Sequence, residues 1–211
     1  MAREIYSRAE RLSDAAVHLG GLVLALGAVP VLIVLTVLIR PEVTAIAGVT
    51  IYGVALIGMI GASAAFNLTV RAAWRGVLQR IDHAAIYLKI AGTYTPFALL
   101  TGQGLALTLG IWGGALAGVA LRVLAPGRWR GLAVALCLAL GWAGVLGGGA
   151  MLAALPGPVV GLMLAGGLLY TGGVAFYLLD RLPFHYTIWH VFVLAASGLF
   201  YGAVLVLVLT A

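Results

Sequence analysis

The stretch LGGLVLALGAVPVLIVLTVLI, residues 19–39, contains no charged side chain. A membrane-spanning α-helix needs about 20 consecutive apolar residues, so this stretch alone predicts one. Transmembrane β-strands would instead show segments of about ten residues with alternating hydrophobicity. Six more apolar runs follow, over residues 43–68, 83–100, 104–124, 131–152, 158–179 and 188–210. We therefore predict an all-α integral membrane protein, with seven helices forming a single domain over residues 1–211.

The composition supports a protein that lies in a bilayer. Of the 211 residues, 64% are hydrophobic and 9% are charged, against about 45–50% and 25% in soluble domains. These values exclude a cytoplasmic enzyme, a nucleic-acid-binding protein and a disulfide-linked secreted domain. The single cysteine, Cys137, cannot form an intrachain disulfide. The net charge of +6 fits contact with anionic lipid headgroups, so membrane lipids are the expected partners and nucleic acid is not.

The basic residues predict the orientation of the helices. Ten of the twelve flank the predicted helices on one side: Arg3, Arg8, Arg11, Arg71, Arg75, Arg80, Arg122, Arg128, Arg130 and Arg181. Arg40 falls on the other side, and Lys89 lies within a helix. Cytoplasmic loops carry the excess of Lys and Arg, so we expect a cytoplasmic N-terminus, an external C-terminus and a multi-pass location in the inner (plasma) membrane.

Polar side chains gather at the cytoplasmic ends of four predicted helices: Asp14, His18, Ser63, Asn67, Asp82, His83, His185, Tyr186 and His190. Polar groups in hydrocarbon are costly and usually face the bundle interior, so we expect a pocket that opens towards the cytoplasm. Ser63 and Asn67 are four residues apart, so they share a helix face and can reach one partner. Alternatively, histidines at the interface can be solvated, and Asp82 can cap a helix N-terminus.

Lys89 lies within a predicted helix, residues 83–100. It follows Asp82 by seven residues, which places both on one helix face. One interpretation is that its long side chain extends towards water at the helix end. Our hypothesis is that the Lys89 ammonium pairs with Asp82 and is contacted by Asn67.

Thirty glycines, several of them spaced as GxxxG, allow helices to approach closely. The pairs are Gly110/Gly114, Gly114/Gly118, Gly144/Gly148 and Gly198/Gly202. Packing within one bundle is the simpler interpretation, and an oligomer formed through these Gly-rich faces is the alternative.

Three segments of the chain resemble one known family. Residues 80–100, RIDHAAIYLKIAGTYTPFALL, closely resemble the third-helix signature of the hemolysin III family, the bacterial branch of the progestin and adipoQ receptor superfamily. Residues 170–193, YTGGVAFYLLDRLPFHYTIWHVFV, look like that family's helix 6–7 region. Asp14 and His18 resemble its N-terminal Asn-x-x-x-His motif, with Asp in place of Asn. Seven helices and a cytoplasmic N-terminus are implied by this resemblance.

The resemblance also implies an intramembrane zinc site. In the family, helix 2 carries Ser-x-x-x-His, helix 3 an Asp and helix 7 His-x-x-x-His; the histidines bind zinc, and the Ser and Asp support the metal or its water. Ser63, Asp82 and His190 match this pattern, whereas Asn67 and Tyr186 stand where two histidines are expected. The implied site is therefore degenerate. His185 and Asp82 are candidates to complete a His/His/Asp ligand set with His190.

Several functions follow from these expectations. The favoured one is a non-enzymatic or receptor-like membrane-homeostasis protein that senses lipid state through its pocket. The alternative is a zinc-dependent intramembrane hydrolase of lipid amides or esters, with Asp82 as proton acceptor and Ser63 positioning the water. A pore-forming hemolysin is disfavoured, because the outer halves of the helices are almost entirely apolar. A small-molecule or proton carrier would have to use Lys89 and Asp82.

Overall fold

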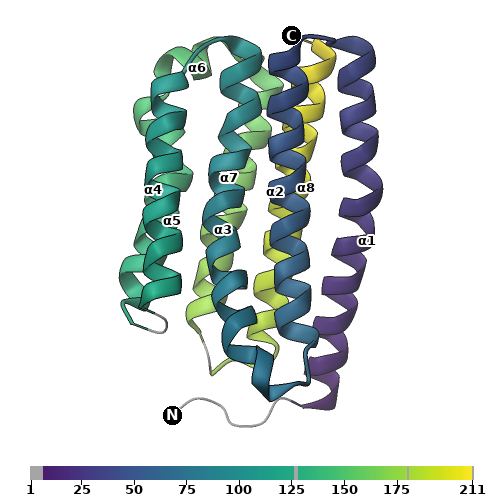
Figure 1. Ribbon diagram of the computed structural model, residues 1–211, viewed down its shortest axis with the longest axis vertical. Coiled ribbons are helices and arrows are strands. Elements are labelled where there is room, and N and C mark those ends of the chain that lie inside the picture. The colour runs from purple at the N-terminus through teal and green to yellow at the C-terminus, as the bar shows by residue number, and fades with distance from the viewer. Residues whose placement is uncertain (1–6, 126–127, 180, 211) are drawn as a thin grey trace.

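The computed structural model describes residues 7–125, 128–179 and 181–210, and this part of the chain is an all-helical bundle without β-strands (Figure 1). Its helices are α1 (Arg8–Ile39), α2 (Val43–Leu68), α3 (Ala72–Thr101), α4 (Leu105–Leu124), α5 (Arg130–Gly147), α6 (Gly149–Ala153), α7 (Gly157–Leu178) and α8 (His185–Thr210). The predicted all-α class is confirmed. Arg3 lies outside the described residues.

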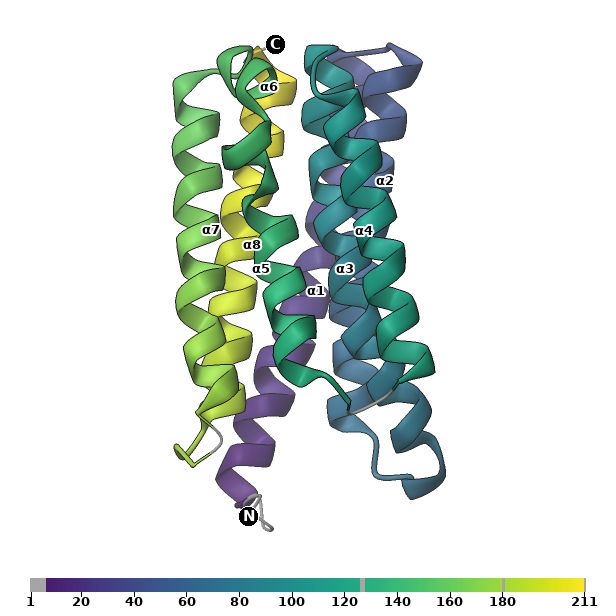
Figure 2. The ribbon, with the colours of Figure 1, turned by 90° about the vertical axis from the view of Figure 1, so that its left-hand side faces the viewer.

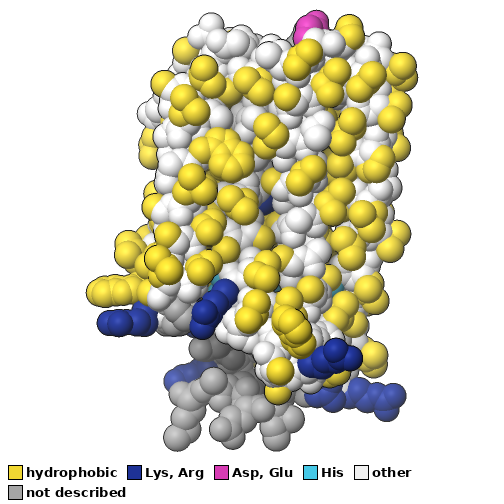
Figure 3. All heavy atoms as spheres, viewed as in Figure 1, with side chains coloured by type: hydrophobic (Ala, Val, Ile, Leu, Met, Phe, Trp, Pro, Cys, Tyr) yellow, Lys and Arg dark blue, Asp and Glu magenta, His cyan; other side chains and the backbone are white. Residues whose placement is uncertain are grey.

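The sides of the bundle are apolar, and the Lys and Arg side chains visible in Figure 3 gather mainly at the end that carries the N-terminus. Within the described residues, six helices are long and apolar enough to cross a membrane: α1, α2, α4, α5, α7 and α8. The long helix α3 is not among them, since Lys89 and several Thr and Tyr residues lower its hydropathy. It nevertheless runs alongside the others through the bundle (Figure 2). The predictions of seven spans and of a cytoplasmic N-terminus remain predictions.

Two helices extend well beyond the apolar segments that the sequence indicates. The apolar run begins at residue 19, but α1 begins at Arg8 because Ser7 forms a capping box with Glu10. The Ser7 Oγ accepts a bond from the Glu10 N–H at 3.1 Å, and the Ser7 N–H donates to Glu10 Oε2 at 2.8 Å. Helix α3 begins at Ala72 rather than near residue 83. Both extensions are polar stretches, which a pattern based on hydrophobicity alone does not assign to helix.

The predicted fifth helix, residues 131–152, is interrupted in the structure. Helix α5 ends at Gly147, and the short α6 begins at Gly149. A Cβ at Gly148 would lie 2.4 Å from the Gly144 carbonyl oxygen, so only glycine fits this break without a shift in the backbone. Pro156 then precedes α7, whose first turn contains Pro158. The remaining predicted ranges differ from the observed helices by a few residues at most.

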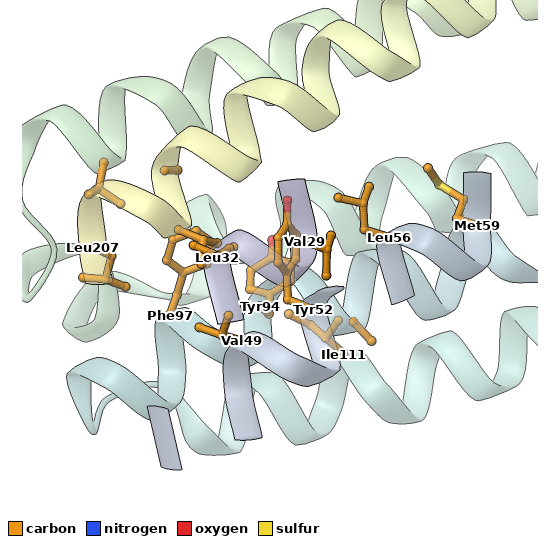
Figure 4. Close-up of a cluster of buried hydrophobic side chains, with 14 of the residues drawn as sticks. Val29, Leu32, Val49, Tyr52, Leu56, Met59, Tyr94, Phe97, Ile111 and Leu207 are labelled. Atoms are coloured by element: carbon orange, nitrogen blue, oxygen red, sulfur yellow. The ribbon is translucent and has the colours of Figure 1, made fainter. Parts of the chain in front are cut away.

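Helix α3 lies at the centre of the bundle and contacts α2, α4, α5, α6 and α8, while α7 packs along α8 (Figure 2). The buried core between these helices includes Leu32, Val49, Tyr52 and Phe97 (Figure 4). Several polar side chains in the bundle bond to the backbone of their own or a neighbouring helix. For example, the Tyr87 hydroxyl donates to the Ala133 carbonyl at 2.9 Å.

The ring of Tyr87 packs directly against the backbone of α4. Tyr87 is fully buried, and a Cβ at Gly118 would lie 2.3 Å from its ring. The Gly114 position likewise faces Leu140, whereas the Gly110 and Gly198 positions have nothing within 4 Å. Some of the GxxxG glycines therefore serve packing inside one chain, and the oligomer stays a prediction.

We predict that Gly118→Ala lowers the free energy of unfolding by about 1–3 kcal/mol, because the new methyl group overlaps a ring that is fully enclosed. Thermal or denaturant unfolding of the detergent-solubilised protein, followed by circular dichroism, measures the change. Gly110→Ala is the matched control on the same helix and should be neutral or slightly stabilising, since alanine favours helix. Equal effects of the two substitutions would contradict this packing.

Candidate functional site

A cavity of about 120 Å³ lies among α1, α2, α3, α4, α5, α7 and α8, towards the end of the bundle that carries the N-terminus. Its polar lining comprises His18, Ser63, Asp82, His83, Arg122, Tyr177, Tyr186 and His190. Six of these were singled out from the sequence: His18, Ser63, Asp82, His83, Tyr186 and His190. The structure thus brings together, along one cavity, polar residues that are up to 172 positions apart in the chain.

Ser63 is the residue on which the polar side chains converge. Its Oγ lies 3.2 Å from Nε2 of His18 and 3.3 Å from Nε2 of His190. The Asp82 carboxylate faces the same hydroxyl. A serine hydroxyl has one proton to donate, so it can donate to only one of these three groups at a time. Ser63, His18 and His190 are all buried, so Ser63 Oγ and the two Nε2 atoms contact one another rather than water. The buried Nδ1 of His190 has no hydrogen-bond partner among the described residues.

The orientation of the His18 ring follows from its contacts. The His18 Nδ1 lies 2.6 Å from the Asp14 carbonyl oxygen, which can only accept, so this nitrogen carries the proton. In the neutral ring, Nε2 is therefore an acceptor. The Asn67 amide nitrogen lies 3.2 Å from it and also donates to the Ser63 carbonyl at 2.9 Å. Ser63 and Asn67 thus share one partner, His18, on the helix face that their spacing indicated.

His18 and His190 also contact each other through their rings. Their centroids are 4.2 Å apart, with an interplanar angle of 63°. Helix α1 supplies one ring and α8 the other, while α2 supplies the hydroxyl between their nitrogens. Contacts among His18, Ser63 and His190 therefore link α1, α2 and α8 beside the cavity.

Several predicted site residues lie elsewhere. His185 does not line the cavity: its Nδ1 lies 3.3 Å from the Phe176 carbonyl oxygen. Asp14 accepts a hydrogen bond from Thr187 and ties α1 to α8. Unlike these two residues, His83 does line the cavity, and its ring centroid lies 6.5 Å from that of Phe66.

The predicted ion pair between Lys89 and Asp82 is wrong, since Lys89 has other partners in the structure. The Lys89 ammonium donates to the Tyr170 hydroxyl at 2.6 Å and lines a neighbouring cavity. Seven helical residues separate Lys89 from Asp82 by about 10 Å along the axis. Aromatic and hydroxyl groups of α7 and α8 are therefore nearer partners.

The side chains present do not fit the three-histidine zinc site that the family resemblance implies. The position expected for one histidine holds Asn67, whose amide nitrogen is engaged with His18. The other holds Tyr186, whose ring centroid is 5.9 Å from that of His190. Neutral amides and phenols are poor zinc ligands compared with imidazole. Within the described part of the chain, no three His, Cys, Asp or Glu side chains are grouped so as to hold a metal ion.

Arg122 is a site residue that sequence reasoning interpreted only as a marker of topology. Its exposed fraction is 8%, it lines the cavity, and its Nε has no hydrogen-bond partner among the described residues. Its location before the end of the apolar run 104–124 was the available signal, because a purely interfacial arginine would lie beyond that run. Arg122 adds a guanidinium that is always charged to a cavity that is also lined by imidazole and phenol rings, apolar groups and the Asp82 carboxyl group.

Comparisons with known proteins agree over nearly the whole chain. A family model described as Haemolysin-III related matches residues 7–201. The "Hemolysin-3 homolog" of Bacillus subtilis (strain 168) is 33% identical over 201 residues, which cover 93% of both chains. The "Hemolysin-3" of Bacillus cereus is 35% identical over 205 residues, covering 95% of this chain and 92% of that protein.

We predict that Ser63→Ala lowers the free energy of unfolding by about 1–3 kcal/mol, because Nε2 of His190 and Nε2 of His18 both lose the hydroxyl between them. Chemical unfolding of the purified protein in detergent measures the loss. Thr44→Ala, an exposed position on the same helix, is the control and should change stability little. A Ser63→Ala protein as stable as the parent would mean that Ser63 does not hold the two rings.

Proposed function

The chain belongs to the hemolysin III family, and from that premise we propose that it is a receptor-like, non-enzymatic membrane-homeostasis protein with a degenerate intramembrane metal site. In this proposal the chain crosses the plasma membrane seven times with its N-terminus in the cytoplasm, and its cavity takes up a lipid-derived ligand from the inner leaflet.

The observation that carries the proposal is that Nε2 of His18 and Nε2 of His190 both face hydrogen-bonding groups of the chain itself. A zinc ligand must direct the lone pair of its imidazole at the ion. The Asn67 amide and the Ser63 hydroxyl stand in front of Nε2 of His18 instead, and Ser63 also faces Nε2 of His190. This hydrogen-bonded arrangement holds the helix ends together through the chain's own side chains. A protein of this kind retains the cavity and loses the activated water that hydrolysis requires.

The lining of the cavity supports binding of an amphiphilic ligand. Apolar side chains such as Met59, Ile60 and Val193 line it beside the imidazoles. Arg122, buried at the wall, provides a positive charge. Pockets that combine an apolar lining with a few placed polar groups are typical of small-molecule sites.

The alternative is a zinc-dependent intramembrane hydrolase of lipid amides or esters. The proximity of Ser63 to both imidazoles, with Asp82 facing its hydroxyl, favours this candidate. His18 would then have to provide the imidazole that position 67 lacks. A pore-forming hemolysin has less support, because the polar side chains that line this cavity gather towards one end of the bundle. The printed names of the two relatives say only that those proteins are hemolysins or homologues of one.

We predict that the purified chain carries far less than one zinc ion per molecule and that Asn67→His combined with Tyr186→His raises the content to about one. The two substitutions restore imidazoles that can replace the amide and phenol. Inductively coupled plasma mass spectrometry of protein exposed to equal zinc concentrations measures both.

The control places His190→Ala in the same double variant, which should abolish the gain. Near-stoichiometric zinc in the parent, lost on His190→Ala, would contradict the degenerate site and support the hydrolase instead. A double variant that never gains zinc would show that positions 67 and 186 are not at the metal site.

A further inference from the structure

A second cavity, of about 110 Å³, adjoins the first and shares four wall residues with it: Ile86, Cys137, Val174 and Trp189. It is enclosed by α3, α5, α7 and α8, and its lining is mainly apolar and aromatic. Within the described residues, Lys89 is the only charged side chain that lines this cavity. An ammonium in an apolar interior is costly unless an opposite charge lies beside it.

The Lys89 ammonium is held in place from two neighbouring helices. Its exposed fraction is 3%, and its Nζ lies 4.4 Å from the ring centroid of Tyr170 on α7 and 4.9 Å from that of Phe200 on α8. It donates to the Tyr170 hydroxyl at 2.6 Å. A lysine ammonium has three N–H donors, so two of them remain after this hydrogen bond.

The hydroxyl group that Lys89 contacts also leaves a proton unused. Tyr170 Oη and Ser197 Oγ are 2.6 Å apart, and either can be the donor. Whichever one donates, the proton of the other hydroxyl is free, because neither group has a further acceptor among the described residues. Lys89, Tyr170 and Ser197 therefore form a group with donors to spare and no opposite charge.

The other hydroxyl groups of the lining are already engaged within the chain. Those of Thr93, Tyr94 and Thr171 donate to backbone carbonyls at 2.7–2.8 Å. The Trp142 indole in turn donates to Thr171 Oγ1 at 3.0 Å. Among the described residues, the unused ammonium and hydroxyl donors of this cavity are thus concentrated around Lys89.

We propose that Lys89, Tyr170 and Ser197 bind one chloride ion in the interior of the bundle. One monovalent anion neutralises one ammonium, and a monatomic ion accepts the two free N–H groups and the free O–H at a single centre. Water accepts the same bonds but leaves the charge uncompensated. A polyatomic oxyanion such as phosphate brings more oxygen atoms, for which the described lining offers no further hydroxyl or ammonium donor. This site needs no metal and does not rest on the function proposed above.

The test is the dependence of thermal stability on the halide ion. The full chain, purified in a non-ionic detergent, is heated in equal concentrations of sodium chloride, sodium bromide or sodium gluconate, and unfolding is followed by tryptophan fluorescence. Chloride and bromide should each raise the Tm of the parent by about 3 °C above its value in gluconate, because an ion that binds only the folded state stabilises it. The shift should saturate as expected for one site.

Lys89→Met removes the charge and keeps an unbranched side chain of similar length. It should show no halide-specific shift, and in gluconate it should be at least as stable as the parent, since the uncompensated ammonium is gone. A general effect of the salts persists in this variant, so the difference between the two proteins reports the site. Tyr170→Phe serves the same purpose if the Met variant does not fold, and it should reduce the halide shift.

Two further variants and a crystallographic measurement locate the ion. Arg71→Gln removes an exposed charge, Arg122→Gln removes the charge of the first cavity, and both should keep the halide shift. In crystals grown with bromide, the anomalous difference map should show one ion in contact with Lys89 Nζ. The proposal is overturned if the parent shows no halide shift, if the shift survives in Lys89→Met, if Arg122→Gln abolishes it, or if bromide does not occupy this position. Zinc content does not enter these measurements, so their failure is distinct from that of the metal-site proposal.

Discussion

Hydrocarbon offers no hydrogen-bond partner, so each polar side chain inside this bundle needs a partner within the protein or an enclosed ligand. Threonines such as Thr36 and Thr95 donate to the carbonyl four residues earlier in their own helix. Tyr201 reaches across to the Ala28 carbonyl at 2.8 Å and joins α8 to α1. The same constraint brings Nε2 of His18 and Nε2 of His190 to one serine hydroxyl, because a buried ring nitrogen without a partner is costly.

That constraint also explains why loss of two expected metal ligands is compatible with a packed bundle. A zinc ion would hold helices together through coordinate bonds, and here hydrogen bonds between Asn67, His18 and Ser63 link α1 to α2. Lys89 is an exception to this pattern, since no carboxylate among the described residues lines its cavity, whereas Arg122 shares its cavity with Asp82. Each lies at the wall of one of two adjoining cavities. A cation that the chain itself leaves without an opposite charge is the feature that most directly indicates a ligand.

Much of the architecture was predictable because it depends on hydrophobicity summed over many residues. The positions of the apolar segments follow from the cost of exposing backbone and charge to lipid, and α2 has the bounds that its apolar run indicates. The extension of α1 depended on a capping box, and the break between α5 and α6 on one close approach at Gly148. These local effects involve one or two residues, so a pattern averaged over twenty residues does not contain them. For the site, spacing correctly placed Ser63 and Asn67 on one face, but it could not exclude His185.

The sequence by itself determined that the chain is helical, apolar and built for a bilayer, and that its polar residues concentrate near one set of helix ends. It did so because composition and helical periodicity depend on each residue's own chemistry. Only the tertiary structure decided which polar groups meet. Lys89 was predicted to pair with Asp82 on its own helix, yet it contacts Tyr170 and Phe200 of two other helices. Such choices depend on how helices are rotated and packed against one another, and contacts between residues far apart in the chain leave no periodic trace in the sequence.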